Sequence, residues 1–234
     1  MHVALLHGLG ADRRAFQRFE RLLPSEWVVR SFDLLGHGEA DKPEFGYSLP
    51  YHAQYIAAEI QQWSGDVHPI VVGHSYGSNV AATLAALHHE LPAGLVMLDP
   101  IIHGHDEVTL TSRTDEMMQG RREGRVGEVV HRLFHRESPA LRQWTIDTWE
   151  SMSVGVIDEI DHDWMRFASM VACPVAIAHG DLELGGGGDL AATWFSNPRV
   201  ERIAGAGHYL HATHARETAD AVERSVTWIA EQPR

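Results

Sequence analysis

The sequence is poor in cysteine and in long apolar stretches. Cys173 is its only cysteine, so an internal disulfide is excluded and a reducing compartment is expected. No stretch approaches the roughly 20 apolar residues that a membrane-spanning helix needs. The N-terminal residues lack the charged and apolar regions of a signal peptide. We therefore expect a cytoplasmic protein with no membrane partner.

Basic residues are the second scarce class. Lys and Arg number 19 against 32 Asp and Glu, which gives a formal net charge of −13 with His neutral. Because nucleic-acid phosphates are bound by clustered positive charge, this balance argues against a nucleic-acid partner. The local basic cluster of Arg121, Arg122 and Arg125 is typical of a solvated helix face. The chain also lacks a nucleotide-binding glycine motif after a strand, a P-loop and a CxxC motif, so we expect no cofactor.

Six short β-rich stretches alternate with helix-like segments over most of the chain. Several of these stretches are apolar without alternation, as strands buried on both faces of a parallel sheet are. The expected strands are 3–7, 28–33, 70–73, 95–98, 175–178 and 200–203, and the expected helices lie near 12–23, 49–63, 76–89, 189–195 and 214–231. This order predicts an α/β fold, with a doubly wound, mostly parallel sheet of about six strands.

Residues 101–168 interrupt this alternation. They contain helix-like stretches, such as 115–134 and 140–152, but no convincing strand. We therefore expect a core formed by residues 1–100 and 169–234, and a helical lid formed by residues 101–168 after the fourth strand. The large apolar residues of the lid region would line a pocket or, for more than half of them, pack the lid on the core. These residues are Trp144, Trp149, Met152, Trp164, Met165 and Met170.

The segment VVGHSYG, residues 71–77, places Ser75 between two glycines. Gly73 and Gly77 each lie two positions from the serine, where a tight turn would leave no room for side chains. An apolar run precedes the segment and an Ala-rich helix-like stretch follows it. A serine on such a turn exposes its hydroxyl, and the helix directs free N–H groups to the place where negative charge develops. Ser75 is therefore the predicted nucleophile.

Four stretches together resemble the α/β-hydrolase fold superfamily, over nearly all of the chain apart from the lid. They are LLHGLG at 5–10, DLLGHGEADKP at 33–43, VVGHSYG at 71–77 and GAGHYLH at 205–211. The resemblance implies that the backbone N–H groups of Leu9 and Tyr76 form an oxyanion hole. It also implies a structural role, without catalysis, for Asp33 and the turn at 36–38.

A serine hydroxyl needs a base to take its proton, and an acid to orient that base. His208, in a glycine-containing loop after the last expected strand, is the predicted base. The resemblance places the acid three residues after a glycine, at Glu183, where the family usually has Asp. Asp99, at the end of the fourth expected strand, is the alternative acid, because some members of the fold keep their acid there. Asp181 is the third candidate.

Histidine is abundant, with 17 residues, and three of them are spaced three apart. His208, His211 and His214 could suggest a metal site, but no paired carboxylate or cysteine spacing accompanies them. We therefore expect no metal.

The sheet is expected to lack an antiparallel hairpin at its edge, because the chain starts almost on the oxyanion strand. The strand at 28–33 would then be an uncovered edge, which makes a homodimer an expectation.

Taken together, these residues predict a cofactor-free serine hydrolase. It would cleave an ester-type bond (a carboxylic ester, thioester or lactone) through an acyl-enzyme. A small, largely apolar substrate is expected, because nothing basic is placed to hold a phosphate or a coenzyme A tail. The alternatives are a carbon–carbon bond hydrolase or a cofactor-free lyase on the same triad, and a slow-turnover ligand-binding protein, since fold alone does not fix function.

Overall fold

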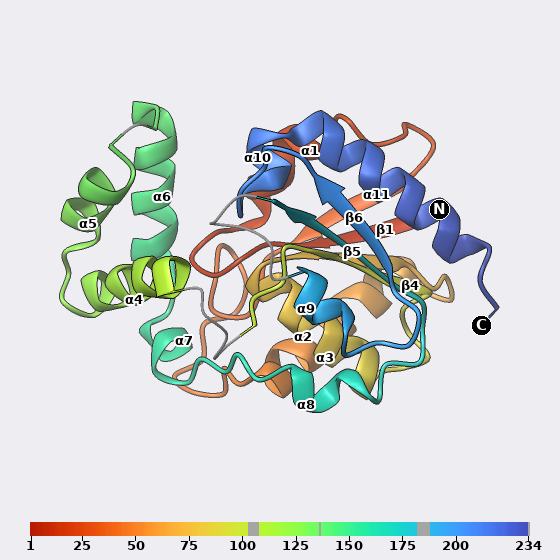
Figure 1. The fold of residues 1–234 in the computed structure, drawn as a ribbon. Helices are drawn as coiled ribbons and strands as arrows, with labels where there is room; N and C mark the ends of the chain where they lie inside the picture. The colour runs from red at the N-terminus through yellow and green to blue at the C-terminus, as the bar shows by residue number, and fades with distance from the viewer. Residues whose placement is uncertain (103–107, 136, 182–187, 234) are drawn as a thin grey trace.

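Six parallel strands form one sheet in the computed structural model, which describes residues 1–102, 108–135, 137–181 and 188–233 (Figure 1). The strand order is β2-β1-β3-β4-β5-β6, so β2 lies at an edge as expected. The strands are β1 (His2–Leu6), β2 (Val28–Phe32), β3 (Ile70–His74), β4 (Gly94–Leu98), β5 (Val175–Gly180) and β6 (Arg199–Ile203). Each overlaps one of the expected strands, and the predicted parallel α/β sheet is confirmed.

Helices cover both faces of the sheet. One face carries α2 (Leu49–Ser64), α3 (Tyr76–Leu87), α8 (Met165–Ala168) and α9 (Gly188–Ala192) (Figure 1). The other carries η1 (Arg13–Phe16), α1 (Gln17–Glu20), α10 (Leu210–Thr213) and α11 (Ala215–Ala230). The expected helix at 12–23 is thus two short pieces, which end in i→i+3 hydrogen bonds just before Pro24. No described helix is both long and apolar enough to cross a membrane.

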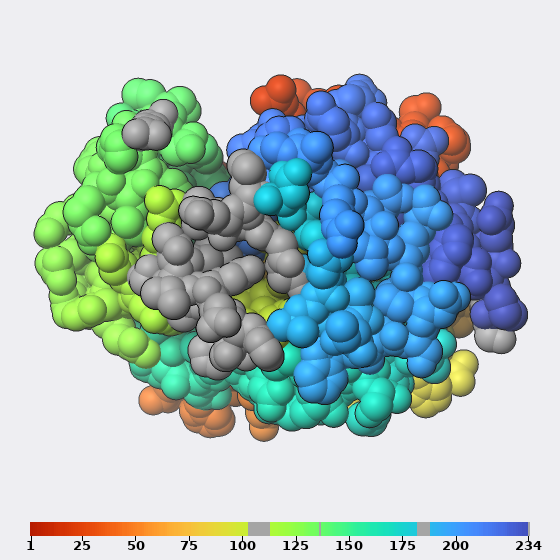
Figure 2. Space-filling model, viewed as in Figure 1, coloured from red at the N-terminus to blue at the C-terminus, as the bar shows by residue number. Residues whose placement is uncertain are grey.

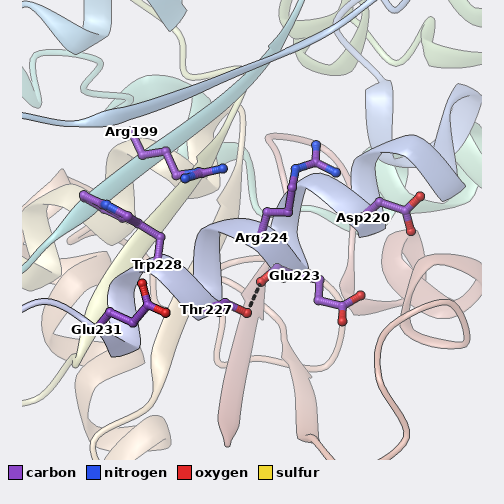
Figure 3. Close-up of a pocket in the computed structure, with 7 residues that line it drawn as sticks. All are labelled: Arg199, Asp220, Glu223, Arg224, Thr227, Trp228 and Glu231. Atoms are coloured by element: carbon purple, nitrogen blue, oxygen red, sulfur yellow. Dashed lines mark hydrogen bonds between the residues drawn. The ribbon is translucent and has the colours of Figure 1, made fainter.

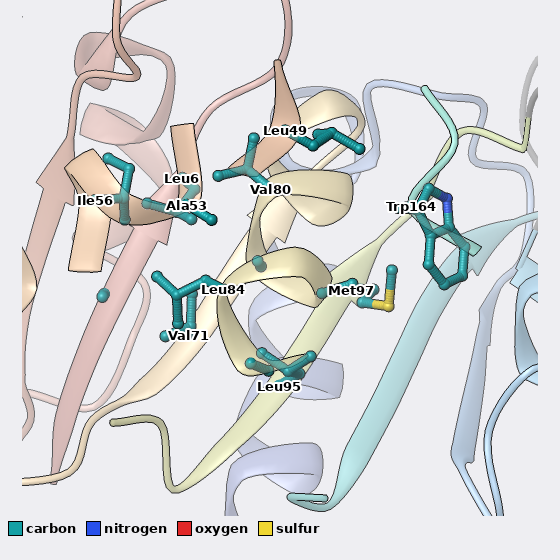
Figure 4. Close-up of a cluster of buried hydrophobic side chains, with 14 of the residues drawn as sticks. Leu6, Leu49, Ala53, Ile56, Val71, Val80, Leu84, Leu95, Met97 and Trp164 are labelled. Carbon is teal, nitrogen blue, oxygen red and sulfur yellow. The ribbon is translucent and has the colours of Figure 1, made fainter. Parts of the chain in front are cut away.

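Strand side chains alternate between two hydrophobic cores, as the period of a β-strand requires. In β1, Ala4 and Leu6 face the core under α2 and α3, whereas Val3 and Leu5 face the core under α1 and α11. Figure 4 shows the first of these cores, in which Trp164 comes from outside the sheet to lie near Met97. Fully burying one such side chain stabilises the fold by about 1.5–3 kcal/mol. The two cores hold the carboxyl ends of the strands in fixed positions.

The segment between β4 and β5, which also includes α8, contains the four remaining helices of the described residues. They are α4 (Val108–Arg122), α5 (Val126–Leu133), α6 (Pro139–Ser151) and α7 (Val154–Asp158), which lie to one side of the sheet (Figure 1). The stretch 115–134 forms parts of two helices because Gly124, at φ +67°, separates them. The segment has its own apolar cluster, which joins the core at Leu35 and Tyr47. The Ser153 N–H also donates to Gly36 O at 2.9 Å.

Candidate active site

Ser75 lies on a strained turn between β3 and α3. Its φ is 55° and its ψ is −122°, a backbone conformation that residues other than glycine rarely adopt. A Cβ at Gly73 would collide with the carbonyl oxygen of Gly77, and a Cβ at Gly77 would collide with the carbonyl oxygen of Leu6. Both glycines are therefore required for the close approach of three backbone segments. The turn places the Ser75 hydroxyl at the carboxyl end of the sheet.

Three side chains form a hydrogen-bonded chain at this place. The Nε2 atom of His208 lies 2.9 Å from Ser75 Oγ, and its Nδ1 atom lies 2.6 Å from Asp99 Oδ2. Because a carboxylate only accepts, Nδ1 carries a proton, and Nε2 faces the serine hydroxyl, whose proton it can accept. Ser75, His208 and Asp99 are 4%, 5% and 3% exposed, respectively.

The strand register explains why Asp99 is beside Ser75. His74 and Leu98 are paired at the ends of β3 and β4, so the next residues of the two strands are Ser75 and Asp99. The Ser75 N–H donates to Leu98 O, at 2.9 Å. Asp99 has a φ of 45°, which turns its chain away from the sheet directly after β4.

Of the three candidate acids, Asp99 and Asp181 differ in their contacts with His208 and its loop. Asp99 contacts the ring of His208. Asp181 Oδ1 instead accepts from the Gly205 N–H at 2.8 Å, so this carboxylate holds the loop that carries the histidine. Glu183, the first choice from the sequence, lies outside the described residues.

The loop at residues 7–10 lies against the nucleophile. A Cβ at Gly8 would be 3.2 Å from Ser75 Cβ, which shows how close the two backbones are. Leu9 follows Gly8 directly, and Tyr76 is the first residue of α3. The first N–H groups of a helix have no intrahelical acceptor, so that of Tyr76 can bind a ligand. The two predicted oxyanion donors thus belong to the two backbone segments that meet at Ser75.

Residues 2–143 match the family model of the alpha/beta hydrolase fold. The chain belongs to this family. One relative is a 2-(acetamidomethylene)succinate hydrolase from Mesorhizobium japonicum. It is 33% identical to this chain over 93 residues, which are 40% of this chain and 33% of that protein. A pimeloyl-[acyl-carrier protein] methyl ester esterase from Neisseria meningitidis is 37% identical over 86 residues, 37% of this chain and 26% of that protein. The matches thus span a third or less of the length of these curated relatives.

Solved structures of other α/β hydrolases are similar over nearly the whole chain. A bromoperoxidase from Bacillus anthracis superposes with a TM-score of 0.82 at 20% identity, over 97% of this chain and 91% of the other. An E-2-(acetamidomethylene)succinate hydrolase superposes with a TM-score of 0.77 at 20% identity, over 97% and 92% of the two chains. At this identity the likeness shows the fold alone.

Two further histidines of this α/β hydrolase surround the ring of His208. The ring centroid of His74 lies 4.8 Å from that of His208 and 4.2 Å from that of His211. His74 Nε2 donates to the backbone carbonyl of His208 at 2.9 Å. Burial, and then the neighbouring histidines, lower the pKa of His74 well below its ordinary value and that of His211 to about 3. Both rings are therefore neutral at pH 7.

The three regularly spaced histidines do not share one site. His208 and His211 are buried, whereas His214 pairs with the Thr213 hydroxyl at 3.0 Å. Within the described parts of the chain, no three His, Cys, Asp or Glu side chains are arranged to hold a metal ion.

The large apolar residues of the helical segment mostly pack it against the α/β-hydrolase core. Trp149 and Met152 are buried in the cluster with Leu35, and the Trp149 indole lies directly against Gly10. Trp164 is fully buried and its Nε1 donates to Ile101 O at 2.9 Å, two residues after Asp99. The segment is thus anchored both to the loop at 7–10 and to the backbone that follows Asp99.

Tyr209 is a candidate site residue that the sequence analysis missed. It follows His208 directly, is 48% exposed, and its ring centroid lies 5.2 Å from that of His208. Its position directly after the predicted base, in the sequence GHY at 207–209, could have identified it. Figure 2 shows the surface indented between the helical segment and the region of α10 and α11, and Tyr209 immediately precedes α10.

Two surface hollows lie away from this site, near the amino ends of the strands. One, of about 440 Å³, is lined by charged residues of α11 and by Arg199 at the start of β6 (Figure 3). The two arginines there pair with a protein group, since Arg199 and Arg224 both bind Glu201. The other, of about 650 Å³, lies between the ends of α2 and α3. Neither hollow is lined by Ser75, His208 or Asp99.

Proposed function

We propose that the chain is a serine hydrolase that cleaves an ester-type bond through an acyl-enzyme. The observation that carries this proposal is the buried hydrogen-bonded chain from Ser75 through His208 to Asp99, with its serine on a glycine-flanked turn. The family and its relatives support the coarser part, because the relatives named above are a hydrolase and a methyl ester esterase. In this proposal Asp99, rather than Glu183, is the acid.

The geometry fits a two-step reaction. Ser75 Oγ attacks the carbonyl carbon while His208 Nε2 takes the hydroxyl proton, and the Asp99 carboxylate stabilises the imidazolium that forms. The carbonyl oxygen becomes negative within reach of the Leu9 and Tyr76 N–H groups. His208 then gives its proton to the departing alcohol or thiol, which leaves an acyl group on Ser75. In the second step His208 takes a proton from water, the hydroxide attacks the acyl carbon, and Ser75 recovers its proton.

The proposed substrate is a small and largely apolar ester, thioester or lactone. Apolar side chains, including Leu9, Trp149 and Tyr47, are the residues that join the helical segment to the core next to the loop at 7–10. In this proposal residues 101–168 act as a lid, whose contact with Gly10 through Trp149 places it beside the reacting carbonyl. The chemistry of the triad uses no cofactor.

The hydrolysis of p-nitrophenyl acetate and butyrate tests the proposal. Wild type, Ser75→Ala, Asp99→Asn, Glu183→Gln and Asp181→Asn are compared at equal concentration. Ser75→Ala is expected to be inactive. Asp99→Asn is expected to lose about 10³–10⁴-fold in kcat, because the neutral amide does not stabilise the imidazolium and its NH2 group can donate to Nδ1, which favours the wrong tautomer of His208. Asp181→Asn is the matched control, since the amide oxygen still accepts from Gly205.

The outcomes that contradict the proposal are distinct. If Glu183→Gln is crippled and Asp99→Asn is not, the acid assignment is wrong. If Ser75→Ala equals an active wild type, Ser75 is not the nucleophile. If wild type is inert on both esters but a fluorophosphonate labels Ser75, the ester substrate is wrong and the carbon–carbon hydrolase, lyase and ligand-binding alternatives replace it.

A further inference from the structure

Two buried histidines hold the loop at 7–10: His7, the first residue of the loop, and His37, from the turn after β2. His7 and His37 are both 0% exposed, and their ring centroids are 5.1 Å apart. Neither contacts Ser75, Asp99 or His208 in any hydrogen bond of the described residues. Burial is the largest cause that lowers the pKa of each ring, so both are neutral at pH 7. Each ring is buried and hydrogen-bonded to backbone groups, so these contacts define the conformation of the loop at 7–10.

His37 holds one peptide of the loop. Its Nε2 accepts from the Gly10 N–H at 3.2 Å, and its Nδ1 faces Leu35 O at 3.0 Å. Because an amide N–H can only donate and a carbonyl can only accept, the ring must carry its proton on Nδ1. The contacts therefore specify one tautomer of the neutral ring, and that tautomer is the one that can hold Gly10.

His7 holds the preceding peptide. Its Nδ1 donates to Gly8 O at 2.8 Å, while its Nε2 accepts from the Leu34 N–H at 3.0 Å. The Gly8 carbonyl and the Leu9 N–H belong to the same planar, trans peptide, so they point in opposite directions. Holding Gly8 O thus restrains one end of the peptide whose other side bears the Leu9 N–H, the proposed oxyanion donor.

Leu9 is consequently the one residue between two anchored peptides. The Gly8–Leu9 peptide is held through His7 and through the Ala11 N–H, which donates to Gly8 O at 3.2 Å. Among the described residues, the Leu9–Gly10 peptide is held by a hydrogen bond to His37, and the Trp149 indole packs against Gly10. Gly10 has a φ of +67°, so only a glycine adopts this turn without strain. Loss of the His37 contact would release the second peptide, so that the first peptide could pivot about Gly8 O and turn the Leu9 N–H away.

We propose that His37 is a positioning residue of the oxyanion hole, which acts through Gly10 to aim the Leu9 N–H at the carbonyl oxygen. This inference rests on the proposed function, because it assigns Leu9 as an oxyanion donor. The turn at 36–38, which the sequence marks as structural only, thereby acquires a role in catalysis without touching the substrate.

A matched pair of substitutions tests this role. In His37→Gln the side-chain amide stands as far from the backbone as Nε2, so its oxygen can accept from Gly10. In His37→Asn the amide stands as far as Nδ1 and cannot reach. Removal of a whole oxyanion donor costs about 10²–10³-fold in kcat. We expect His37→Asn to lose about 10- to 100-fold in kcat with KM changed less than about threefold, because the donor is misaimed but still present. His37→Gln should recover most of this loss.

His52→Phe is the control for loss of a buried histidine in this region. His52 is also 0% exposed, and neither of its ring nitrogens has a hydrogen-bond partner among the described residues. It should keep wild-type kcat. Unfolding of all variants is followed by thermal denaturation, so that kcat is compared only at temperatures at which each variant is folded.

A second readout does not depend on turnover. ¹⁵N NMR of the histidine rings should show His37 protonated on Nδ1 and unprotonated on Nε2, and the Gly10 amide should exchange faster in His37→Asn than in wild type and His37→Gln. Failure of the proposed function would appear as an inert wild type, while these signals would still test the contact. The inference is overturned if His37 carries its proton on Nε2, if His37→Asn keeps wild-type kcat on an ester that wild type turns over, or if His37→Gln is as slow as His37→Asn while folded.

Discussion

Two groups of three buried histidines flank the nucleophile turn, and they differ in what their ring nitrogens contact. The first, here the triad-side group, consists of His74, His208 and His211. The second, the loop-side group, consists of His7, His37 and His52, whose successive ring centroids are 5.1 and 6.4 Å apart. Residue type and burial are the same in both groups. What distinguishes them is that one ring of the first group joins a hydroxyl to a carboxylate, whereas two rings of the second join backbone groups.

Each group also contains a ring that is poorly paired. In the described parts of the chain, both ring nitrogens of His52 lack a hydrogen-bond partner, and so does the Nδ1 of His211. A buried histidine is therefore not by itself evidence of a function. The contacts of its two nitrogens decide whether it transfers a proton, aims a backbone group or fills space.

The largest expected effect distinguishes His208 from all the other rings. His208→Ala should lower kcat for a p-nitrophenyl ester by about 10⁴–10⁶-fold, because the base proposed for Ser75 is lost. The same truncation at His211 should lower kcat by less than about tenfold. Single-turnover kinetics at pH 7.5, with circular dichroism to confirm folding, provide the measurement. A His208→Ala variant within tenfold of wild type would remove the contrast between the two groups.

The next effect is on the stability of the fold, and histidines of both groups contribute to it. The pKa values of His7, His37, His52, His74 and His211 are lowered in the folded protein, in each case with burial as the largest cause. A histidine whose pKa is lower when folded binds its proton preferentially in the unfolded chain. The folded state is thus favoured above the unfolded pKa of about 6.5, and this advantage is lost as the pH falls below it.

The expected result is a steep fall in the free energy of unfolding between pH 6.5 and pH 5. Each histidine contributes up to about 1.4 kcal/mol per pH unit in this range. Urea denaturation at pH 7.5, 6.5 and 5.5 measures the change. A free energy of unfolding that stays constant from pH 7.5 to pH 5.5 would contradict the neutral state of these five histidines.

A smaller effect is expected for His74, the ring that touches backbone in the triad-side group. His74→Leu removes the donor to His208 O and leaves a buried carbonyl unpaired, which costs about 1–3 kcal/mol of stability. We expect kcat to fall about tenfold, because the loop that carries His208 loses a contact. His74→Gln, whose amide can donate from the position of Nε2, should recover both quantities. Equal kcat values for the two variants would show that the hydrogen bond has no effect on catalysis.

The contrast between the two groups also shows what the sequence could predict. Local patterns were sufficient for the strands and for the glycine-flanked turn at Ser75, because strand period and backbone crowding act over a few residues. The contact of Asp99 with His208 was harder to predict, since Asp99 is beside Ser75 through the pairing of His74 with Leu98 across two strands. Loop spacing places Glu183 first among the candidate acids, and loop spacing carries no information on strand register. Glu183 lies outside the described residues, so its choice as the acid stays a prediction.

The loop-side group was beyond prediction for a similar reason. Gly10 and His37 are 27 positions apart, as are His7 and Leu34. Both contacts form because β1 and β2 are parallel neighbours, so that the residues after the two strands meet at one edge of the sheet. A tautomer depends on such contacts, and no pattern along the chain specifies it.

The smallest expected effect is that of His52→Phe, and its sign is what matters. Both ring nitrogens of His52 are buried without a partner among the described residues, and burial lowers the pKa of this ring to about 3. Phe has a similar shape and no polar atoms, so the substitution should raise the free energy of unfolding by about 0.5–2 kcal/mol at pH 7. The gain should be larger at pH 5.5, where the unfolded histidine is protonated. A loss of 1 kcal/mol or more would instead mean that a water molecule or a ligand pairs with His52. In that case all three rings of the loop-side group would be specified by hydrogen bonds, and the distinction between paired and unpaired histidines would hold only in the triad-side group.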